Sequence, residues 1–448
     1  MSAPPARKSH PLSLRTSLGR ERWWLLSLAT MPYASYLGLV MMLGVYISAL
    51  KQRGDRVLQL CHRMGFGWLS LGLLVSSTLA VYKGDSFLQL ANFLPFFLLF
   101  GVLVNEPTVT ASQAHADPCH EDTSQETSNI LFRKLEHLAQ GLLLSATPFM
   151  AVACIQYFIK QLAIAQSSII RLIPDTILTQ LQPYDHRVNI LFGNSNALCA
   201  YLVIILGLSL GLAIQGLRQK DRPHFYWAQL VGLGLCIGAI FATGSRNGLI
   251  VTLTLIAIAL YAARSYRWVF FLGIAVISGL VFTAINFGFG ERAMSLALFT
   301  QDARIEIWQQ SLVLIQQRPI FGWGFSGFRS QYVPYSIQHY AMLWHAHNIW
   351  LLLASEAGIP VMLGFNLIVG RICYGGARTL RQTTLSKRDR AVLLSYLLAF
   401  AGCSLYGLFD VLLHDSRINV ITWVTLAAIY SMTQTACNDI PDTEPTIQ

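Results

Sequence analysis

Apolar segments long enough to cross the hydrocarbon core of a membrane recur along this chain, and they constrain its fold more than any other feature. Because lipid cannot hydrogen-bond the backbone, only α-helices and closed β-barrels cross it. The strands of a barrel would appear as short segments of alternating hydrophobicity, unlike these uninterrupted runs. Charged residues make up only 12% of the chain, and its mean hydropathy is +0.49. The sequence therefore predicts an all-α polytopic integral membrane protein.

The basic residues around the first apolar run predict how the chain enters the membrane. Residues 23–50 carry no charge, yet Arg20 and Arg22 precede them and Lys51 and Arg53 follow. One straight crossing would place one basic flank on the wrong side, because cytoplasmic loops are enriched in Lys and Arg. Pro32 offers a break, so we expect a hairpin of two short spans that returns to the cytoplasm.

The later apolar segments bring the total to about twelve spans, with both termini inside the cell. The expected domains are a cytoplasmic tail over 1–22, a membrane domain over 23–436 and a second cytoplasmic tail over 437–448. Residues 105–129 are expected to form a mobile cytoplasmic loop, and residues 291–346 a large, partly helical periplasmic loop. The spans after the hairpin are expected at 64–82, 87–104, 138–159, 190–214, 225–243, 248–263, 268–290, 348–370, 391–409 and 418–436.

Neither the net charge nor the cysteines indicate a binding site. The chain carries a net charge of +10, but most basic residues lie in short loops between apolar segments, where they orient a membrane protein. Nucleic acid is therefore not an expected partner. The 8 cysteines are scattered without a C-x-x-C pair, so neither a metal site nor a disulfide framework is predicted.

Two arginines in the expected outer loops are candidate anion-binding groups. Arg246 lies in a turn, at residues 242–248, between two apolar segments, and Arg304 opens a segment whose apolar residues have helical spacing. The rigid fork of a guanidinium suits phosphate oxygens. The alternatives are that Arg246 is an interfacial arginine and that Arg304 only pairs with Glu306 or Asp302.

Two histidines, His345 and His347, come immediately before an apolar segment at the outer face. Histidines two positions apart lie on different faces of a helix, and no third ligand follows at a metal-binding spacing, so no metal is predicted. A histidine can accept a proton near neutral pH, which makes a general base the favoured interpretation. The alternative is an interfacial histidine without a catalytic role.

A G-x-G-x-x-G pattern at residues 322–327 does not predict a dinucleotide site, because no βαβ unit surrounds it. We expect a turn with aromatic anchors there. Other polar residues of the outer face are secondary candidates, with helix capping or interface polarity as the alternative. They are Asn194, Asn196, Arg329, His345, Asn348, Asp410, His414, Asp415 and Arg417.

Four stretches together resemble the O-antigen ligase and polymerase superfamily of bacterial membrane glycosyltransferases. They cover about residues 190–360, and their order, spacing and shared outer placement carry the resemblance. The stretches are Gly-Asn-Ser-Asn at 193–196, Thr-Gly-Ser-Arg at 243–246, residues 304–308 leading to Arg-Pro-Ile-Phe-Gly-Trp-Gly at 318–324, and His-Asn at 347–348 leading to Glu-Ala-Gly at 356–358.

The resemblance implies a multi-pass protein of the bacterial inner membrane with its active site facing the periplasm. It implies transfer of a glycan from a polyprenyl diphosphate carrier, such as undecaprenyl diphosphate, to a hydroxyl of a glycan or glycolipid acceptor, with inversion and without metal or cofactor. His347, followed by Asn348, matches the position of the family's base, although His345 is an alternative. Arg246 and Arg304 would bind the diphosphate.

Two other functions remain open at this stage. The same arginines could bind bicarbonate or another small anion in a transporter, and the polar residues near 410–415 resemble a branch of the superfamily proposed to act in inorganic-carbon uptake. Few polar residues lie inside the expected spans, which disfavours a transporter. The second alternative is a structural or assembly factor.

Overall fold

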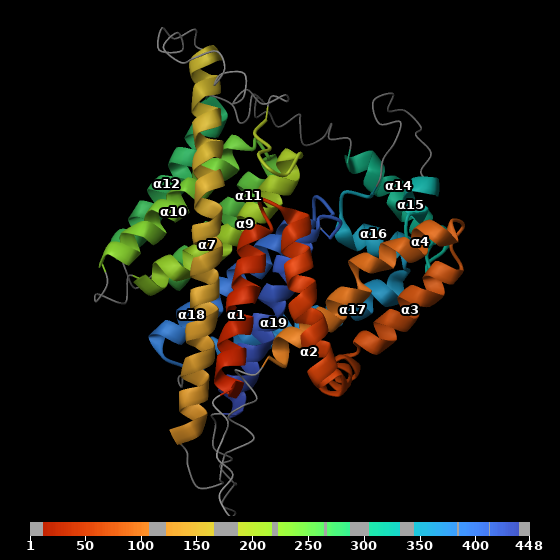
Figure 1. The fold of residues 1–448 in the computed structure, drawn as a ribbon. Helices are drawn as coiled ribbons and strands as arrows, with labels where there is room; N and C mark the ends of the chain where they lie inside the picture. The colour runs from red at the N-terminus through yellow and green to blue at the C-terminus, as the bar shows by residue number, and fades with distance from the viewer. Residues whose placement is uncertain are drawn as a thin grey trace, which may run out of the picture.

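The fold is described from a computed structural model of the chain (Figure 1). It describes residues 12–106, 122–164, 187–216, 223–263, 267–286, 304–331, 345–382, 385–411 and 413–438, and these residues form helices and connections without any strand. The predicted all-α fold is confirmed for this part of the chain. The elements are α1 (Leu12–Thr30), α2 (Ser35–Met64), α3 (Phe66–Thr78), α4 (Lys83–Gln89), η1 (Leu90–Asn92), α5 (Leu94–Val104), α7 (Asp122–Ile164), α9 (Ser195–Gly216), α10 (Pro223–Ala242), α11 (Arg246–Ala262), α12 (Arg267–Asn286), α14 (Arg304–Gln317), α15 (Gly327–Gln331), α16 (Ile349–Glu356), α17 (Ile359–Thr379), α18 (Lys387–Gly407) and α19 (Ser416–Asn438).

Helices α1 and α2 form a hairpin at the predicted position. Neither is among the candidate membrane spans of the described residues, so their crossing of the membrane stays a prediction. The chain turns at residues 31–33, and a Cβ added to Gly38 would lie 2.9 Å from Met31 Cα, so the two helices meet closely at the turn. Figure 1 shows the start of α1 and the end of α2 at the same, lower end of the molecule. Two boundaries differ from prediction: α1 begins inside the expected tail, at Leu12, and α2 continues through the basic segment with a kink at Arg53.

The centre of the molecule is the packing of α9 against α18. A Cβ added to Gly207 would lie 2.3 Å from Ala399 N, and one added to Gly211 would lie 2.3 Å from Ser395 Cβ. Small residues four apart on both helices therefore bring the two backbones together, as in membrane helix pairs. Helix α9 is almost completely buried, and α7, α10, α11 and α19 surround it.

The predicted span over 348–370 is not one continuous helix. Helix α16 ends at Glu356 and α17 begins at Ile359, because Gly358 between them has a φ of 92°. The segment at 319–324 pairs with this break: Ile359 N donates to Pro319 O at 2.8 Å, and Gly324 N donates to Glu356 O at 2.8 Å. The break is stabilised because the loop accepts and donates the hydrogen bonds that a continuous helix would have made internally.

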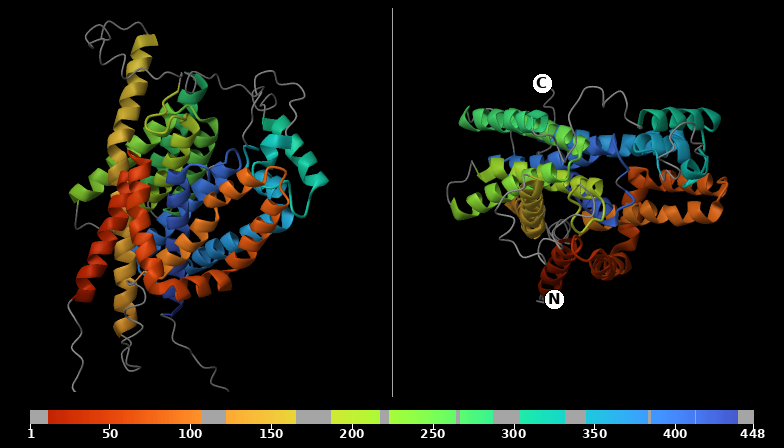
Figure 2. Two further views of the ribbon diagram at one scale, coloured as in Figure 1. Left: turned by 45° about the vertical axis from the view of Figure 1, so that its right-hand side comes forward. Right: turned by 90° about the horizontal axis from the view of Figure 1, so that it is seen from above.

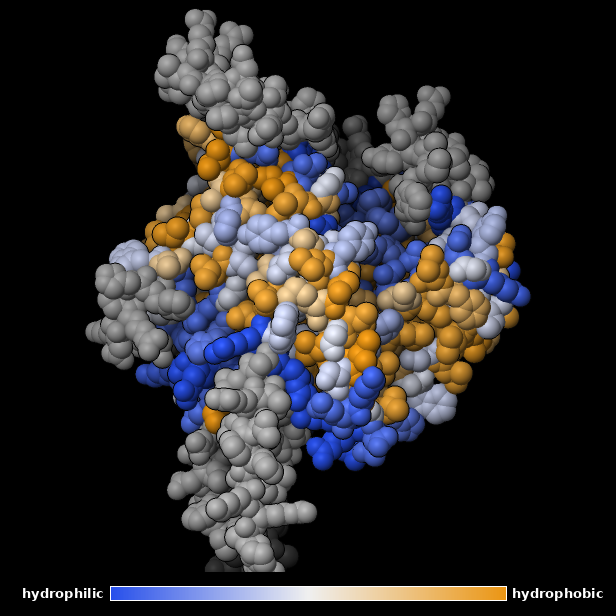
Figure 3. All heavy atoms as spheres, in the orientation of Figure 1, coloured by the Kyte–Doolittle hydropathy of each residue, from blue (hydrophilic) through white to orange (hydrophobic). Residues whose placement is uncertain are grey.

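Among the described residues, five helices are long and apolar enough to cross a membrane by length and composition. They cover Lys83–Val104, Ser128–Gln161, Ser195–Gly216, Ile359–Thr379 and Lys387–Gly407, and shorter apolar helices cover Phe66–Thr78, Tyr226–Ala242, Arg246–Ala262 and Phe270–Thr283. Large apolar side chains such as Leu144 and Trp227 lie exposed. Figure 3 shows hydrophobic residues over the middle of the molecule and hydrophilic ones gathered at the lower end. Such a surface suits a lipid environment.

Part of the predicted loop at 105–129 is helical, because α7 begins at Asp122. Residues 107–121 lie outside the described residues, as do most of the expected outer loop at 165–186 and residues 287–303 and 332–344 of the longest one. The described part of that longest loop contains α14 and α15, which agrees with a partly helical segment. Figure 2 shows these helices beside α4, at one end of an elongated molecule seen from above.

Candidate active site

A histidine–aspartate pair lies where α16 begins and α18 ends. His347 Nδ1 is 3.2 Å from Asp410 Oδ1, and Asp410 Oδ1 also accepts from Val411 N at 2.9 Å. Asp410 is buried, whereas the His347 ring is partly exposed. If Nδ1 carries the proton and donates to the carboxylate, Nε2 has a free lone pair. The pair therefore holds His347 in the tautomer that a general base needs.

The backbone around His347 is strained and well supported. His347 has a φ of 49°, in the left-handed region that few residues other than glycine adopt. Asn348 caps α16 by accepting from Trp350 N at 2.9 Å and Leu351 N at 3.0 Å, and its Nδ2 donates to Leu408 O at 3.0 Å. Because Asn348 joins the start of α16 to the end of α18, it fixes the two chain segments that carry the His–Asp pair. Such strain is typical of functional sites.

Two more histidines extend this cluster. The ring centroid of His345 lies 4.4 Å from that of His347 and 5.9 Å from that of His414. Burial lowers the pKa of His345 to about 4, and the neighbouring His347 ring acts in the same direction. Burial raises the pKa of Asp410, but the hydrogen bond from His347 and the nearby imidazoles outweigh burial and leave it below its ordinary value. Near neutral pH, His345 is therefore neutral and Asp410 is ionised.

The same cluster has the donor atoms of a metal site. His345, His347 and Asp410 each offer one ligand atom, and these atoms lie within 4.8 Å of one another. Asp410 supplies the third ligand that the local spacing of the histidines did not show. Imidazole and carboxylate donors suit zinc and similar ions, so the absence of a metal, expected from the sequence, stays a prediction.

The structure brings the two candidate arginines together. Arg246 is the first residue of α11, whose N-cap Ser245 accepts from Gly248 N at 3.4 Å, and Arg304 is the first residue of α14. With the Asn247 amide turned so that its oxygen faces Arg304, Arg304 Nη1 donates to that oxygen at 2.8 Å. Arg304 is also close enough to His345 to lower the pKa of His345. Arg304 therefore lies between the histidine cluster and the start of α11, where Asn247 follows Arg246 directly.

A third arginine, Arg187, joins the turn that carries Arg246. Arg187 Nε donates to Thr243 O at 2.8 Å and its Nη2 donates to Asn196 Oδ1 at 2.7 Å. Tyr406 also belongs to this group, because its hydroxyl donates to Asn196 O at 3.1 Å and lies 3.0 Å from Ser245 Oγ. Asn196 therefore connects two parts of the site. Arg187 links it to the turn at residues 242–248, and Tyr406 links it to α18.

The other secondary candidates divide into two groups. Arg329 and His414 line a polar cavity beside the histidine cluster. Arg417 instead pairs with Asp415 at 2.6 Å and donates to Leu191 O at 2.7 Å, while its guanidinium lies over the Phe192 ring. Asp415 and Arg417 therefore hold the connection before α9 in place.

The predicted turn at 322–327 has the expected aromatic anchors. Gly322 and Gly324 have positive φ values of 65° and 80°. Phe325 stacks on Phe93 with 4.8 Å between ring centroids, and Trp323 Nε1 donates to Leu314 O at 3.0 Å. Both glycines allow close packing of the backbone, because a Cβ at Gly322 would clash with Glu356 and one at Gly324 with Ala80.

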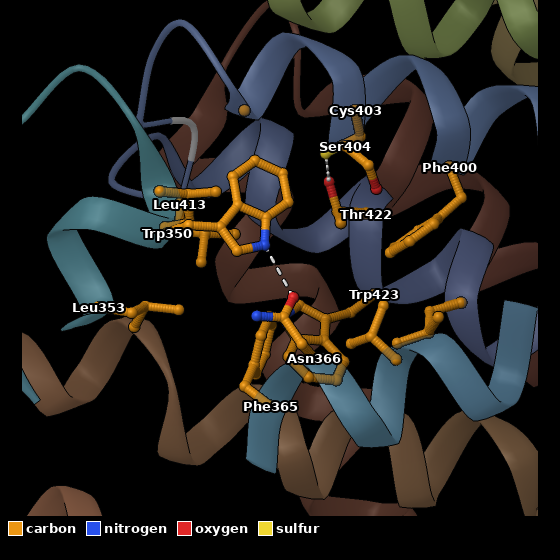
Figure 4. A pocket seen from close by; sticks show the side chains of 14 residues that line it. Trp350, Leu353, Phe365, Asn366, Phe400, Cys403, Ser404, Leu413, Thr422 and Trp423 are labelled. Atoms are coloured by element: carbon orange, nitrogen blue, oxygen red, sulfur yellow. Dashed lines mark hydrogen bonds between the residues drawn. The ribbon is translucent and has the colours of Figure 1, made fainter. Parts of the chain in front are cut away.

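An apolar cavity lies close to the His–Asp pair. Its volume is about 70 Å³, and its lining includes Trp350 and Trp423 from α16 and α19. Figure 4 shows Trp350 Nε1 donating to Asn366 Oδ1, at 2.8 Å, across this cavity. Because Ile349 and Gly407 also line it, the cavity begins within three residues of His347 and Asp410.

Residues 231–365, less than a third of the chain, match the family model described as O-antigen ligase. Over these residues the chain is similar to the O-antigen ligase family. The matched region contains Arg246, Arg304, His345 and His347. No curated protein matches the chain. The match gives no support to the transporter alternative.

Sequence reasoning missed two residues of the site, and each had a weak signal. Arg187 lies in an expected outer loop close to the Gly-Asn-Ser-Asn stretch at 193–196, but it belongs to no motif. Tyr406 lies within an apolar segment, where a tyrosine is usually a packing residue. Both lie outside the matched region, as does Asp410.

Proposed function

We propose that this protein is a metal-independent, inverting glycosyltransferase that moves a glycan from a polyprenyl diphosphate carrier to an acceptor hydroxyl. The observation that carries the proposal is the His347–Asp410 pair with Arg304 near it and Arg246 in the turn that Arg304 contacts; His347 and both arginines lie in the region that matches the O-antigen ligase family. Ligation to a lipid and polymerisation of a glycan form the same bond, and both fit this site.

His347 and Asp410 are assigned the proton transfer. The acceptor hydroxyl gives its proton to His347 Nε2 as its oxygen attacks the anomeric carbon, and the bond from that carbon to the carrier's diphosphate oxygen breaks. Asp410 keeps Nδ1 protonated and stabilises the imidazolium that forms. The oxygen enters opposite the departing diphosphate, so the anomeric configuration inverts.

The arginines are assigned the leaving group. The diphosphate departs with the bonding electron pair, and Arg246, Arg304 and the α11 N-terminus stabilise the charge that develops on it. Arg187 supports this arrangement by holding the turn at Thr243. The apolar cavity beside Trp350, of about 70 Å³, has room for only a short part of the prenyl chain, so most of that chain would lie in the surrounding lipid.

The membrane arrangement forms part of the proposal. We infer that the four shorter apolar helices, the two helices of the α1–α2 hairpin and α19 also cross the bacterial inner membrane, giving about twelve spans with the site facing the periplasm. The support is the hairpin of α1 and α2, which returns the basic segment at 51–63 to the end of the molecule where α1 begins (Figure 1).

The test is surface glycan in a deletion strain complemented with variants. His347→Ala, Arg246→Ala and Arg304→Ala should each abolish glycan transfer while the protein still inserts and folds. The matched controls are His62→Ala and Arg378→Ala, which are exposed on α2 and α17 and should leave transfer unchanged. Normal surface glycan in all three site variants would reject the proposed function.

A further inference from the structure

A polar cavity of about 450 Å³ lies next to the histidine cluster. Residues that are far apart in the sequence line it. They are Asp85, Leu88, Gln89 and Asn92 of the α4–η1 segment, Ser326 before α15 and Arg329 within it, His345 and His414 of the histidine cluster, and Glu356 at the end of α16.

The walls of this cavity are held in place by packing and hydrogen bonds. Phe325 stacks on Phe93, and a Cβ added to Gly324 would lie 2.1 Å from Ala80 Cβ, so the turn lies directly against the α4–η1 segment. Asn92 O accepts from Asn419 Nδ2 at 2.9 Å, which ties the same segment to α19. The cavity therefore exists before a ligand binds, which lowers the entropic cost of binding.

Glu356 forms a fixed part of the cavity wall. It is 2% exposed, and its Oε1 accepts from Phe328 N at 3.1 Å. Its own carbonyl accepts from Ser76 Oγ at 2.8 Å, so α3, α16 and the turn before α15 converge on this one residue. A change in any of these elements would alter the cavity.

The lining chemistry suits a molecule with many hydroxyls. Asp85 accepts hydrogen bonds, Arg329 donates them, and the amides of Gln89 and Asn92, which hydrogen-bond each other at 2.7 Å, do both. An anion would meet the Asp85 carboxylate, and an apolar ligand would leave the polar groups without partners. The volume falls within the roughly 300–1,000 Å³ of small-molecule sites.

The cavity also lies where an acceptor must lie. His345 lines it, and the His345 ring centroid is 4.4 Å from that of the candidate base, His347. A sugar in the cavity can therefore direct one hydroxyl toward His347, while the carrier approaches from the arginines and the apolar cavity. The two substrates would meet at the His–Asp pair.

We propose that this cavity is the acceptor subsite and that it binds a sugar residue through its hydroxyls, with Gln89, Asn92, Asp85 and Arg329 as specificity-determining residues. This inference rests on the proposed function, because only a glycosyltransferase would require an acceptor beside His347. It adds the α4–η1 segment to the site, although that segment lies about 150 residues before the family match begins.

Binding of defined sugars tests the inference without transfer. The full-length protein in nanodiscs is mixed with the methyl glycosides of glucose, galactose, rhamnose and N-acetylglucosamine, and saturation-transfer NMR reports which of them bind. At least one should bind the wild type, and Gln89→Leu and Asp85→Asn should each weaken it by roughly tenfold, because each change removes or weakens a hydrogen bond from the cavity lining to a sugar hydroxyl. The control Lys83→Gln lies on the same helix, outside the cavity lining, and should bind normally.

The possible outcomes distinguish a failure of the proposed sugar subsite from a failure of the proposed transfer mechanism. His347→Ala should still bind the glycoside, because His347 does not line the cavity. No bound glycoside, or unchanged binding in both cavity variants, would overturn the subsite. If the cavity variants lose binding while His347→Ala keeps normal surface glycan, the sugar site stands and the proposed mechanism fails. Thermal midpoints equal to the wild type would show that the variants are folded.

Discussion

The proposed proton transfer depends directly on Asp410, because its carboxylate contacts His347 Nδ1. In Asp410→Asn, the amide can still accept from Val411 N, so the loop should fold as before. Because Val411 N and His347 Nδ1 both contact Asp410 Oδ1, the amide oxygen in that place can still accept from Nδ1, but the neutral amide does not stabilise the imidazolium that forms on His347. We expect transfer to fall by roughly 10²–10⁴-fold, the range of general-base effects.

Initial rates of transfer, measured with membranes from the complemented strain, would check this expectation. The matched control is Asp415→Asn in the same connection, because Asp415 pairs with Arg417 instead of His347. If both variants lose activity equally, the connection matters only for folding, and the base must be sought elsewhere.

Adding and removing metal distinguishes two roles for His347, that of a general base and that of a metal ligand. If His347 acts as a base, EDTA should leave transfer unchanged. Micromolar Zn²⁺ should inhibit it, since zinc bound by His345, His347 and Asp410 would occupy the proton-accepting site. The measurement is transfer by purified protein after EDTA treatment, then with Zn²⁺, then with EDTA again. Loss of activity with EDTA that Zn²⁺ restores would replace the proposed mechanism with a metal-dependent one.

Sequence identified the individual residues of the site better than their partners. His347 and Asn348 are recognisable because a histidine and a helix-capping residue stand directly before an apolar segment. The partner of His347 is 63 residues away and is brought close only by the packing of α16 against the end of α18. For the same reason, the local spacing of two histidines could not show the third donor of a metal site.

At the level of elements, the break between α16 and α17 is the least predictable feature that the site requires. Residues 348–370 are apolar enough to predict one span. The break depends on hydrogen bonds from the segment at 319–324, which an apolar pattern does not reveal. The hairpin of α1 and α2 was predictable, because Pro32 and two basic flanks gave independent signals.

The substitution Gly358→Ala tests whether this break supports the fold. A Cβ at Gly358 would lie 2.0 Å from Ile320 O, and the φ of 92° is strained for alanine. The strain alone costs about 1–3 kcal/mol, and the loop must also move. We expect the thermal midpoint in detergent to fall by several degrees.

Gly370→Ala is the control for that experiment. Gly370 lies within α17, and nothing lies within 4 Å of an added Cβ. Alanine is favoured over glycine inside a helix, so this variant should be as stable as the wild type or slightly more so. Equal midpoints for both variants would mean that the 319–324 segment does not constrain the break.

At the scale of the whole molecule, the sidedness of the site depends on the first hairpin. The ends of α1 and α2 lie together at the lower end in Figure 1, and α14 and α15 lie toward the opposite end. If the basic segment at 51–63 is cytoplasmic, every later crossing places the arginines and His347 outside. If one crossing in the hairpin were reversed, every later loop would lie on the opposite side of the membrane. The side on which residues 51–63 lie therefore decides where the proposed transfer occurs.

Cysteine labelling tests that order directly. Asp85→Cys should react with a membrane-impermeant maleimide in cells whose outer membrane alone is permeabilised, because α4 belongs to the expected outer face. Gly54→Cys, where an added Cβ meets nothing within 4 Å, should react only after the inner membrane is broken. The parent protein measures background from the native cysteines, of which Cys61, Cys199, Cys236 and Cys403 are buried. Labelling of position 54 from outside would reverse the hairpin and place His347 in the cytoplasm, where a periplasmic transferase could not act.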